Sequence, residues 1–188
     1  MKSIAIFGSG EGGNAENICD YFADSDCVKV VFICTNNKNA YIVNRAKKLN
    51  IPVVYTNKKE LALFEKLHTT LKEYSVDYII LAGFLLKIPF KMVRSYSKKI
   101  INIHPSLLPK YGGRGMYGKN IHRSVLQNNE GESGITIHFV NENYDEGEVI
   151  LQKRCVLSFG ETLDSLQNKI RALEFLYFPK TIEKILLK

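Results

Sequence analysis

The sequence lacks several features that would place it in a specialised class of protein. No stretch approaches the roughly 18 apolar residues that a membrane-spanning helix needs. The apolar run at the N-terminus is too short for a secretory signal and ends at Gly8. No linker, low-complexity segment or internal repeat interrupts the 188 residues. We therefore expect a single cytoplasmic domain that spans residues 1–188 and has no membrane attachment.

The four cysteines lack the spacing of a metal or redox site. Cys19, Cys27, Cys34 and Cys155 contain no CxxC pair, and no cluster of cysteine and histidine has the spacing of metal ligands. In a cytosolic chain such cysteines are mostly small buried apolar residues. The sequence therefore predicts no metal site.

Acidic residues are fewer than basic ones, 19 against 26, which leaves a net charge of +7. The lysines are scattered in pairs such as Lys47-Lys48 and Lys98-Lys99 and are not grouped with interleaved aromatic residues. This pattern predicts neither a nucleic-acid nor a membrane partner, and it carries no information on oligomeric state. It fits a solvated surface or a protein that binds small anionic substrates.

The first half of the chain alternates strand and helix patterns. The segment 28–34 is nearly all apolar, as a strand buried on both faces is expected to be. Apolar residues between 61 and 71 recur at helical spacing. The patterns predict strands at 3–7, 28–34, 52–55, 78–81 and 100–103, and helices at 14–22, 40–49 and 61–71. This alternation predicts an α/β fold with a mostly parallel sheet and helices on both faces.

The second half has a different pattern. Residues 110–118 hold four glycines and are expected to form a loop. Two strands are predicted at 134–140 and 148–157, separated by a polar turn. A closing helix is predicted from about 162 to 187, kinked or divided by Pro179.

A glycine-rich loop, Gly8-Ser9-Gly10-Glu11-Gly12-Gly13-Asn14, follows the first predicted strand and contains the pattern GxGxxG. A dinucleotide site would also need an acidic residue at the end of the second strand, but the chain reads Cys34-Thr35-Asn36-Asn37 there. No Lys-Ser or Lys-Thr pair follows the glycines, which excludes a loop of the nucleoside triphosphate type. Backbone N–H groups at the start of a helix still suit a phosphate group. A tight turn with no ligand is the alternative.

A catalytic pattern lies where the predicted strand 100–103 ends. Asn102 and His104 are two residues apart, so on a strand they point to the same face, and Pro105 then ends the ladder. The amide can donate to an oxyanion, and the imidazole can carry a proton near neutral pH. Asp145 supplies a carboxylate in the turn-like segment Tyr144-Asp145-Glu146-Gly147. If the three side chains converge, they would suit acyl transfer to an amine.

Two other histidines are weaker candidates. His122 follows the glycine-rich segment 110–118, and a structural role is favoured for it. His138 alternates with Ile137 and Phe139 along a predicted strand, so it can face either the site or solvent.

With these motifs in hand, the chain resembles the folate-dependent formyltransferases over nearly its whole length. The resemblance rests on residues 9–14, 81–84, 102–109 and 144–147, and Glu174 in the last predicted helix points to the branch that acts on glycinamide ribonucleotide. It implies a Rossmann-like formyltransferase fold. It also implies transfer of the formyl group of 10-formyltetrahydrofolate, a co-substrate, to the amine of glycinamide ribonucleotide in purine biosynthesis, through a tetrahedral intermediate and without a metal.

The resemblance further implies two substrate sites that meet at the ends of the strands. Catalysis would depend on Asn102, His104 and Asp145. The ribonucleotide would be held by Gly12, Gly13, Asn14, Arg171 and Glu174. The folate would lie against Leu85, Leu86, Lys87, Ile88, Asn102, Val140 and Asn141. Many members of the family carry a basic residue at the position of Leu86, and here Lys87 follows it directly.

Four alternatives compete with this interpretation. A formyltetrahydrofolate deformylase would share the catalytic residues but resembles longer chains with an additional regulatory domain. A methionyl-tRNA formyltransferase would need a tRNA-binding domain after the last helix. A sugar-nucleotide formyltransferase is disfavoured by Glu174 and the glycine loop. A non-enzymatic anion-binding module would explain the loop and the charge, but not the presence of Asn102, His104 and Asp145 together.

Overall fold

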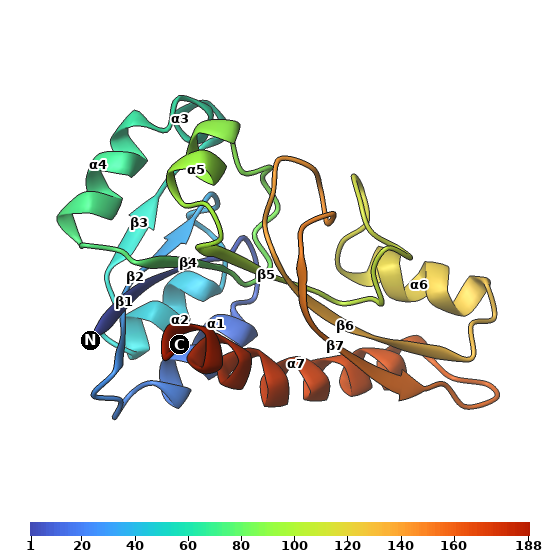
Figure 1. Cartoon of the computed structure of the whole chain (residues 1–188). Coiled ribbons are helices and arrows are strands. Elements are labelled where there is room, and N and C mark those ends of the chain that lie inside the picture. The colour runs from blue at the N-terminus through green and yellow to red at the C-terminus, as the bar shows by residue number, and fades with distance from the viewer.

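Seven strands form one sheet, and seven helices accompany it, in a computed structural model that describes residues 1–188 (Figure 1). The strands are β1 (Lys2–Phe7), β2 (Val28–Thr35), β3 (Val53–Tyr55), β4 (Tyr78–Leu81), β5 (Ile100–His104), β6 (Glu132–Phe139) and β7 (Val149–Val156). The helices are α1 (Gly13–Tyr21), α2 (Ile42–Lys48), α3 (Lys58–Leu63), α4 (Glu65–Glu73), α5 (Phe90–Ser95), α6 (Lys119–Gln127) and α7 (Leu163–Leu186).

The sheet has the strand order β3-β2-β1-β4-β5-β6-β7. The first five strands pair in parallel, whereas β6 and β7 are antiparallel to their neighbours. The chain winds outward from β1 to β3 and then returns to place β4 on the other side of β1. In such sheets ligands bind beyond the carboxyl ends of the strands at the point of reversal, which here lies between β1 and β4.

Two hydrophobic cores cover the two faces of the sheet. Alternate residues of β1 point to opposite sides, so Ile4 and Ile6 belong to one core and Ala5 and Phe7 to the other. The larger core includes side chains from α1, α2, α6 and α7, and the smaller one includes side chains from α3, α4 and α5. The predicted α/β architecture, a mostly parallel sheet with helices on both faces, is confirmed.

The helical pattern predicted at 61–71 belongs to two helices rather than one. Phe64 separates α3 from α4 with a left-handed φ of 65°, yet its side chain is only 4% exposed and lies in the smaller core. The apolar spacing therefore continues across the break. Burial of the Phe64 ring supplies a reason for a non-glycine residue to hold this conformation.

The predicted C-terminal helix is continuous, and the prediction that Pro179 could divide it is wrong. Proline has no N–H to donate to the carbonyl four residues earlier, which belongs to Phe175. Asn17 of α1 supplies the missing donor, because its Nδ2 lies 3.0 Å from the Phe175 oxygen. The hydrogen bond between helices replaces the one lost within α7.

The sequence patterns missed α5 and α6. In α6, Ile121 and Val125 are four residues apart and buried, while most of the other side chains are polar. The helix follows the glycine-rich segment and packs on α7 within the larger core.

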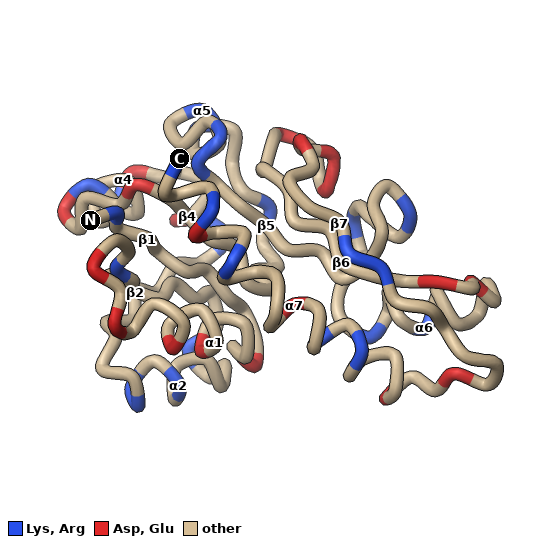
Figure 2. Tube along the Cα trace, turned by 60° about the horizontal axis from the view of Figure 1, so that its bottom comes forward, with Lys and Arg blue, Asp and Glu red and all other residues tan.

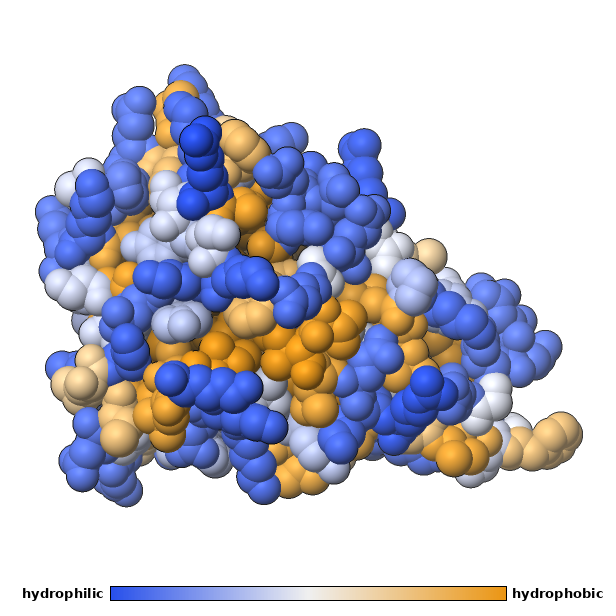
Figure 3. All heavy atoms as spheres, in the orientation of Figure 1, coloured by the Kyte–Doolittle hydropathy of each residue, from blue (hydrophilic) through white to orange (hydrophobic).

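The surface carries charge of both signs. Lysine and arginine lie on elements throughout the molecule with acidic residues between them, and they do not form one continuous band (Figure 2). Apolar side chains gather near the middle of the face shown in Figure 3, where α7 lies; Leu176 of this helix is 47% exposed. None of the helices combines the length and apolar character needed to cross a membrane.

Candidate active site

A cavity of about 1060 Å³ lies beyond the carboxyl ends of β1, β4 and β5. Its wall continues through residues 113–118, Tyr144 and Asp145, and one side of α7. The cavity therefore occupies the place that the strand order predicts, and segments from the whole length of the chain contribute to it.

The glycine loop forms the part of the wall between β1 and α1. Gly12 has a φ of 76°, and a Cβ atom at this position would lie only 2.9 Å from the Cα of Ile42. Both facts require glycine here, since other residues rarely adopt this φ and the backbone of α2 leaves no room. The close packing places the first N–H groups of α1 at the cavity.

Ser9 connects this loop to the segment after β4. Its Oγ donates to Oδ1 of Asn36 and accepts a 2.9 Å hydrogen bond from the N–H of Leu85. Its own N–H donates to the carbonyl of Gly83 at 3.0 Å. Asn36 lies just after β2, where a dinucleotide-binding protein needs an acidic residue, and here it bonds to the protein itself.

Positive charge and unpaired polar atoms surround the start of α1. Arg45 donates from Nε to the Glu11 carbonyl at 2.9 Å, and Arg171 lies near Gly13 on the other side. Asn14 donates from Nδ2 to Glu174 at 3.0 Å, while its buried Oδ1 has no partner in the protein. Arg45 also pairs with Glu16 through Nη1, so its charge is already compensated. This end of the cavity offers N–H groups and the Arg171 guanidinium to an anion, and oxygen acceptors to a hydroxyl group.

Burial raises the pKa of Glu174, although its hydrogen bond from Asn14 and the charge of Arg171 act in the opposite direction. The half-buried carboxylate therefore lies in an environment that disfavours its own charge. A ligand that donates hydrogen bonds would offset this cost.

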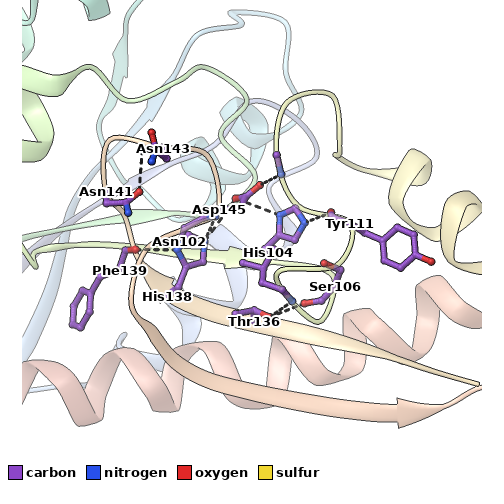
Figure 4. Close-up of polar contacts among 12 residues, drawn as sticks. Asn102, His104, Ser106, Tyr111, Thr136, His138, Phe139, Asn141, Asn143 and Asp145 are labelled. Atoms are coloured by element: carbon purple, nitrogen blue, oxygen red, sulfur yellow. Dashed lines mark hydrogen bonds and ion pairs between the residues drawn. The ribbon is translucent and has the colours of Figure 1, made fainter. Parts of the chain in front are cut away.

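Asn102 and His104 of β5 both line the cavity, as expected from their spacing. The antiparallel register places Asn102 directly opposite His138 of β6, and Nδ2 of Asn102 lies 3.1 Å from Nε2 of His138 (Figure 4). His138 lies 2.9 Å from the Phe139 carbonyl through Nδ1, so Nδ1 carries the hydrogen and Nε2 accepts. Burial lowers the pKa of His138, which favours this neutral form.

The carboxylate of Asp145 lies between the two histidines. Its Oδ1 is 3.5 Å from Nδ1 of His104 and 3.7 Å from Nε2 of His138. Its Oδ2 accepts a 2.9 Å hydrogen bond from the N–H of Gly113, and the backbone of Asp145 is left-handed with a φ of 56°. The three predicted catalytic side chains thus lie at one end of the same cavity (Figure 4).

The predicted folate residues have different surroundings. Leu85 lines the cavity and is 52% exposed, whereas Ile88 is 5% exposed and lies in the smaller core, so its side chain is not available to a ligand. Leu86 and Val140 pack against the same core. The ammonium group of Lys87 lies 5.4 Å from the centre of the Tyr144 ring.

The last predicted folate residue, Asn141, lies outside the cavity wall. Its side chain accepts a 3.0 Å hydrogen bond from the N–H of Asn143 and shapes the turn that leads to Asp145. Among the predicted folate residues, Leu85 and Asn102 are therefore those whose side chains reach the cavity.

Sequence reasoning did not select several residues that line the cavity. Arg114 contributes positive charge, and Arg45 pairs with Glu16. His122 is 6% exposed with a buried Nδ1 that has no partner. Burial is the main cause of a lowered pKa at His122, with a smaller effect from His104. The alternation of His138 with apolar neighbours was the only sequence signal for its position. No group of three or more His, Cys, Asp or Glu side chains is arranged to hold a metal ion.

The family model and the similar proteins of known function agree with one another. Residues 2–182 match the family model described as formyl transferase. The chain is 36% identical to the chloroplastic phosphoribosylglycinamide formyltransferase of Arabidopsis thaliana, over 90% of this chain and 60% of that one. It is 32% identical to the phosphoribosylglycinamide formyltransferase of Haemophilus influenzae, over 97% of this chain and 86% of the relative.

Similarity extends to solved structures. The crystal structure of phosphoribosylglycinamide formyltransferase from Bacillus halodurans matches with a TM-score of 0.90 and 33% identity, over 100% of this chain and 96% of that one. The chain spans about 60% of the length of the Arabidopsis relative.

Proposed function

The chain belongs to the formyl transferase family, and on this basis we propose that it transfers the formyl group of 10-formyltetrahydrofolate to the amine of glycinamide ribonucleotide. One observation carries the proposal: Asn102, His104 and Asp145 line a cavity that also reaches the start of α1. An enzyme that joins a phosphorylated amine to a formyl donor needs both features in one space. A single sheet supports all of these segments, in keeping with one domain over residues 1–188.

The ribonucleotide occupies the end of the cavity beside α1. The N–H groups of Gly12, Gly13 and Asn14 bind its phosphate with help from the positive end of the helix. Arg171 adds positive charge, and its Cζ lies 5.0 Å from the centre of the Phe175 ring. Glu174 and the unpaired Oδ1 of Asn14 accept hydrogen bonds from the ribose hydroxyls.

The folate approaches along the segment after β4. Leu85 provides an exposed apolar contact, and the backbone from Leu86 to Ile88 provides polar groups. The turn from Val140 to Asp145, which Asn141 shapes, presents Tyr144 and Asp145 as the other wall for the pterin. This arrangement brings the formyl group to Asn102, between the two substrates.

The reaction is a direct transfer between two nitrogen atoms. The amine nitrogen bonds to the formyl carbon, and the carbonyl electron pair moves to the oxygen to form a tetrahedral intermediate. The bond from carbon to the folate nitrogen then breaks, and that nitrogen takes a proton from His104. The attacking amine loses one proton, which recharges the imidazole. Formylated ribonucleotide and tetrahydrofolate are the products.

The three proposed catalytic side chains have different roles in this reaction. Asn102 donates an amide hydrogen to the oxyanion, a contribution on the order of 3 kcal/mol for one such donor. His104 in its charged form stabilises the oxyanion and passes the proton on Nδ1 to the departing nitrogen, which is worth roughly a hundred- to ten-thousand-fold in rate. Asp145, 3.5 Å from that Nδ1, favours the imidazolium and orients the ring.

The test mixes purified protein with 10-formyltetrahydrofolate, with and without glycinamide ribonucleotide, and follows the folate absorbance together with the ribonucleotide product. We expect deformylation only when the ribonucleotide is present, with formylated ribonucleotide formed in equal amount. Release of formate in both mixtures would indicate a hydrolase instead. Folate binding without turnover would contradict an enzymatic function.

A further inference from the structure

The imidazole of His104 is held from the side opposite Asp145 by a backbone carbonyl. Its Nε2 lies 2.8 Å from the oxygen of Tyr111, at the start of the glycine-rich segment (Figure 4). A carbonyl can only accept a hydrogen bond, so Nε2 must carry a hydrogen. Nδ1 is then the nitrogen that remains to face Asp145 and exchange a proton with a substrate.

The Tyr111 backbone adopts an unusual conformation to present this carbonyl. Its φ is 58°, in the left-handed region that residues with a Cβ atom seldom occupy. Such a conformation persists only when the surroundings hold it. Gly112 and Gly113 follow directly, so the chain after Tyr111 offers little stiffness of its own.

Hydrogen bonds of the Tyr111 phenol hold this backbone conformation. Its Oη donates to Glu130 at 2.9 Å and accepts from Nδ2 of Asn128 at 2.8 Å. Glu130 also receives two 3.0 Å hydrogen bonds from Lys110, and the hydrogen bonds from Lys110 and Tyr111 lower its pKa, so it is an ionised acceptor. Asn128 and Glu130 belong to the turn between α6 and β6 and do not line the cavity.

The chain before Tyr111 is fixed independently. The hydroxyl of Ser106 donates to the Lys110 carbonyl at 2.7 Å. Thr136 donates to the Ser106 carbonyl at 2.7 Å (Figure 4). Beyond Tyr111, the N–H of Gly113 donates to Asp145. One short stretch therefore bonds to both His104 and Asp145, and the Tyr111 ring is its last rigid anchor before the glycines.

We propose that Tyr111 is a positioning residue for His104: its phenol, held by Asn128 and Glu130, maintains the backbone conformation that keeps the Tyr111 carbonyl on Nε2. Tyr111 does not line the cavity, and it acts through the imidazole by selecting the tautomer that leaves Nδ1 for proton transfer. The inference rests on the proposed function for its effect on rate, and on the geometry alone for its effect on the imidazole.

The test is Tyr111→Phe, which keeps the ring and removes both phenol hydrogen bonds. We expect kcat to fall about tenfold while the KM values of both substrates stay unchanged, because a small displacement of a catalytic group strongly reduces rate. Nitrogen chemical shifts of isotope-labelled histidine are measured in parallel, and the chain has only four histidines. In the variant, the neutral His104 imidazole is expected to change from the Nε2–H tautomer to a mixture of tautomers.

Two further variants separate positioning from folding. Glu130→Gln keeps an acceptor for the phenol and is expected to retain the wild-type tautomer, whereas Glu130→Ala is expected to behave like Tyr111→Phe. Tyr21→Phe is the matched control, because Tyr21 donates to Glu183 at 2.8 Å far from the cavity; it should change neither measurement. The variants are compared by their imidazole shifts and by kcat.

Unchanged His104 shifts in folded Tyr111→Phe would overturn the proposal, as would equal behaviour of Glu130→Gln and Glu130→Ala. If the wild-type protein forms no formylated product but the shifts change as expected, the proposed function fails and the positioning role of Tyr111 stands.

Discussion

Asn102 has two amide hydrogens, and the structure assigns one of them to a partner. Nε2 of His138 lies 3.1 Å from Nδ2 of Asn102, and it is free to accept because Nδ1 of the same ring bonds to the Phe139 carbonyl. The amide is thereby oriented, and its second hydrogen remains for an oxyanion. His138 thus contacts the proposed catalytic group Asn102.

The proposed role of Asp145 depends on the charge of its side chain. Asp145→Asn keeps the shape of the side chain and removes the negative charge 3.5 Å from His104. We expect kcat to fall about 100-fold. The loss reflects the missing negative charge beside an imidazolium formed at His104 during the reaction.

The measurement is the rate of formyl transfer by both proteins over a range of about pH 5 to 9. Glu146→Gln is the matched control, since the exposed neighbouring carboxylate bonds only to Asn143 and should leave the profile unaltered. An Asp145→Asn variant with wild-type rate and profile would show that the carboxylate has no such role.

The ionised carboxylate of Glu174 is expected to lower the stability of the folded protein and to strengthen binding of the ribonucleotide. Its pKa is raised by burial, so at neutral pH its ionised form destabilises the folded protein relative to the unfolded chain. Glu174→Gln removes that charge, and we expect a higher melting temperature without ligands. The KM for the ribonucleotide should rise roughly tenfold, because a hydrogen bond to a charged group is lost.

The two effects are measured by thermal unfolding and by steady-state kinetics with each substrate varied in turn. The stability difference should shrink as the pH falls through the folded pKa of Glu174, where the wild-type carboxyl becomes neutral as well. Glu183→Gln, at a half-buried position on the same helix and outside the cavity wall, serves as the control. A rise in the KM of the folate alone would argue against the placement of the ribose.

At the scale of elements, the contact between α1 and α7 explains how a helix continues through proline. Pro179 leaves the Phe175 carbonyl without a donor in its own helix, and Asn17 provides one at 3.0 Å. Asn14, one turn earlier, bonds to Glu174. The same helix pair that tolerates the proline therefore also aligns the groups proposed to bind the ribonucleotide.

Asn17→Ala is expected to lower the free energy of unfolding by about 1–3 kcal/mol, since it leaves a carbonyl unpaired. In a Pro179→Ala background the helix regains its N–H, so the same substitution should destabilise the protein less. Urea unfolding of the four proteins in this double-mutant cycle measures the difference. Asn44→Ala, on the exposed face of α2, is the control. Equal losses in both backgrounds would exclude this role for Asn17.

At the scale of the whole molecule, two buried histidines make stability depend on pH. Burial lowers the pKa values of His122 and His138 below the unfolded value of 6.5. The unfolded chain therefore binds more protons in acid, and stability rises with pH. The contribution of the two residues is complete above the unfolded pKa and is lost as the pH falls through it.

We expect the free energy of unfolding in urea to decrease between about pH 7.5 and pH 5.5. In the double variant His122→Gln, His138→Gln the decrease should be smaller, because neither replacement binds a proton. Glu174 acts in the opposite direction at the acidic end, so the comparison between the two proteins isolates the histidines. Identical slopes would contradict the assignment.

The sequence by itself determined those features that depend on neighbours along the chain. Residue spacing identified the alternation of strands and helices, and the two-residue spacing of Asn102 and His104 placed them on one face. It left α6 unrecognised, although Ile121 and Val125 have helical spacing, because glycines and polar residues surround them.

Only the tertiary structure decided which distant residues meet. The period of a strand shows which side chains share a face but not the register with the next strand, so the pairing of Asn102 with His138 depends on how β5 and β6 align. The contact of Asp145 with His104 and that of Asn14 with Glu174, 160 residues apart, depend on packing of the whole chain. Such contacts form only when helices have packed on both faces of the sheet, and no local sequence pattern specifies them.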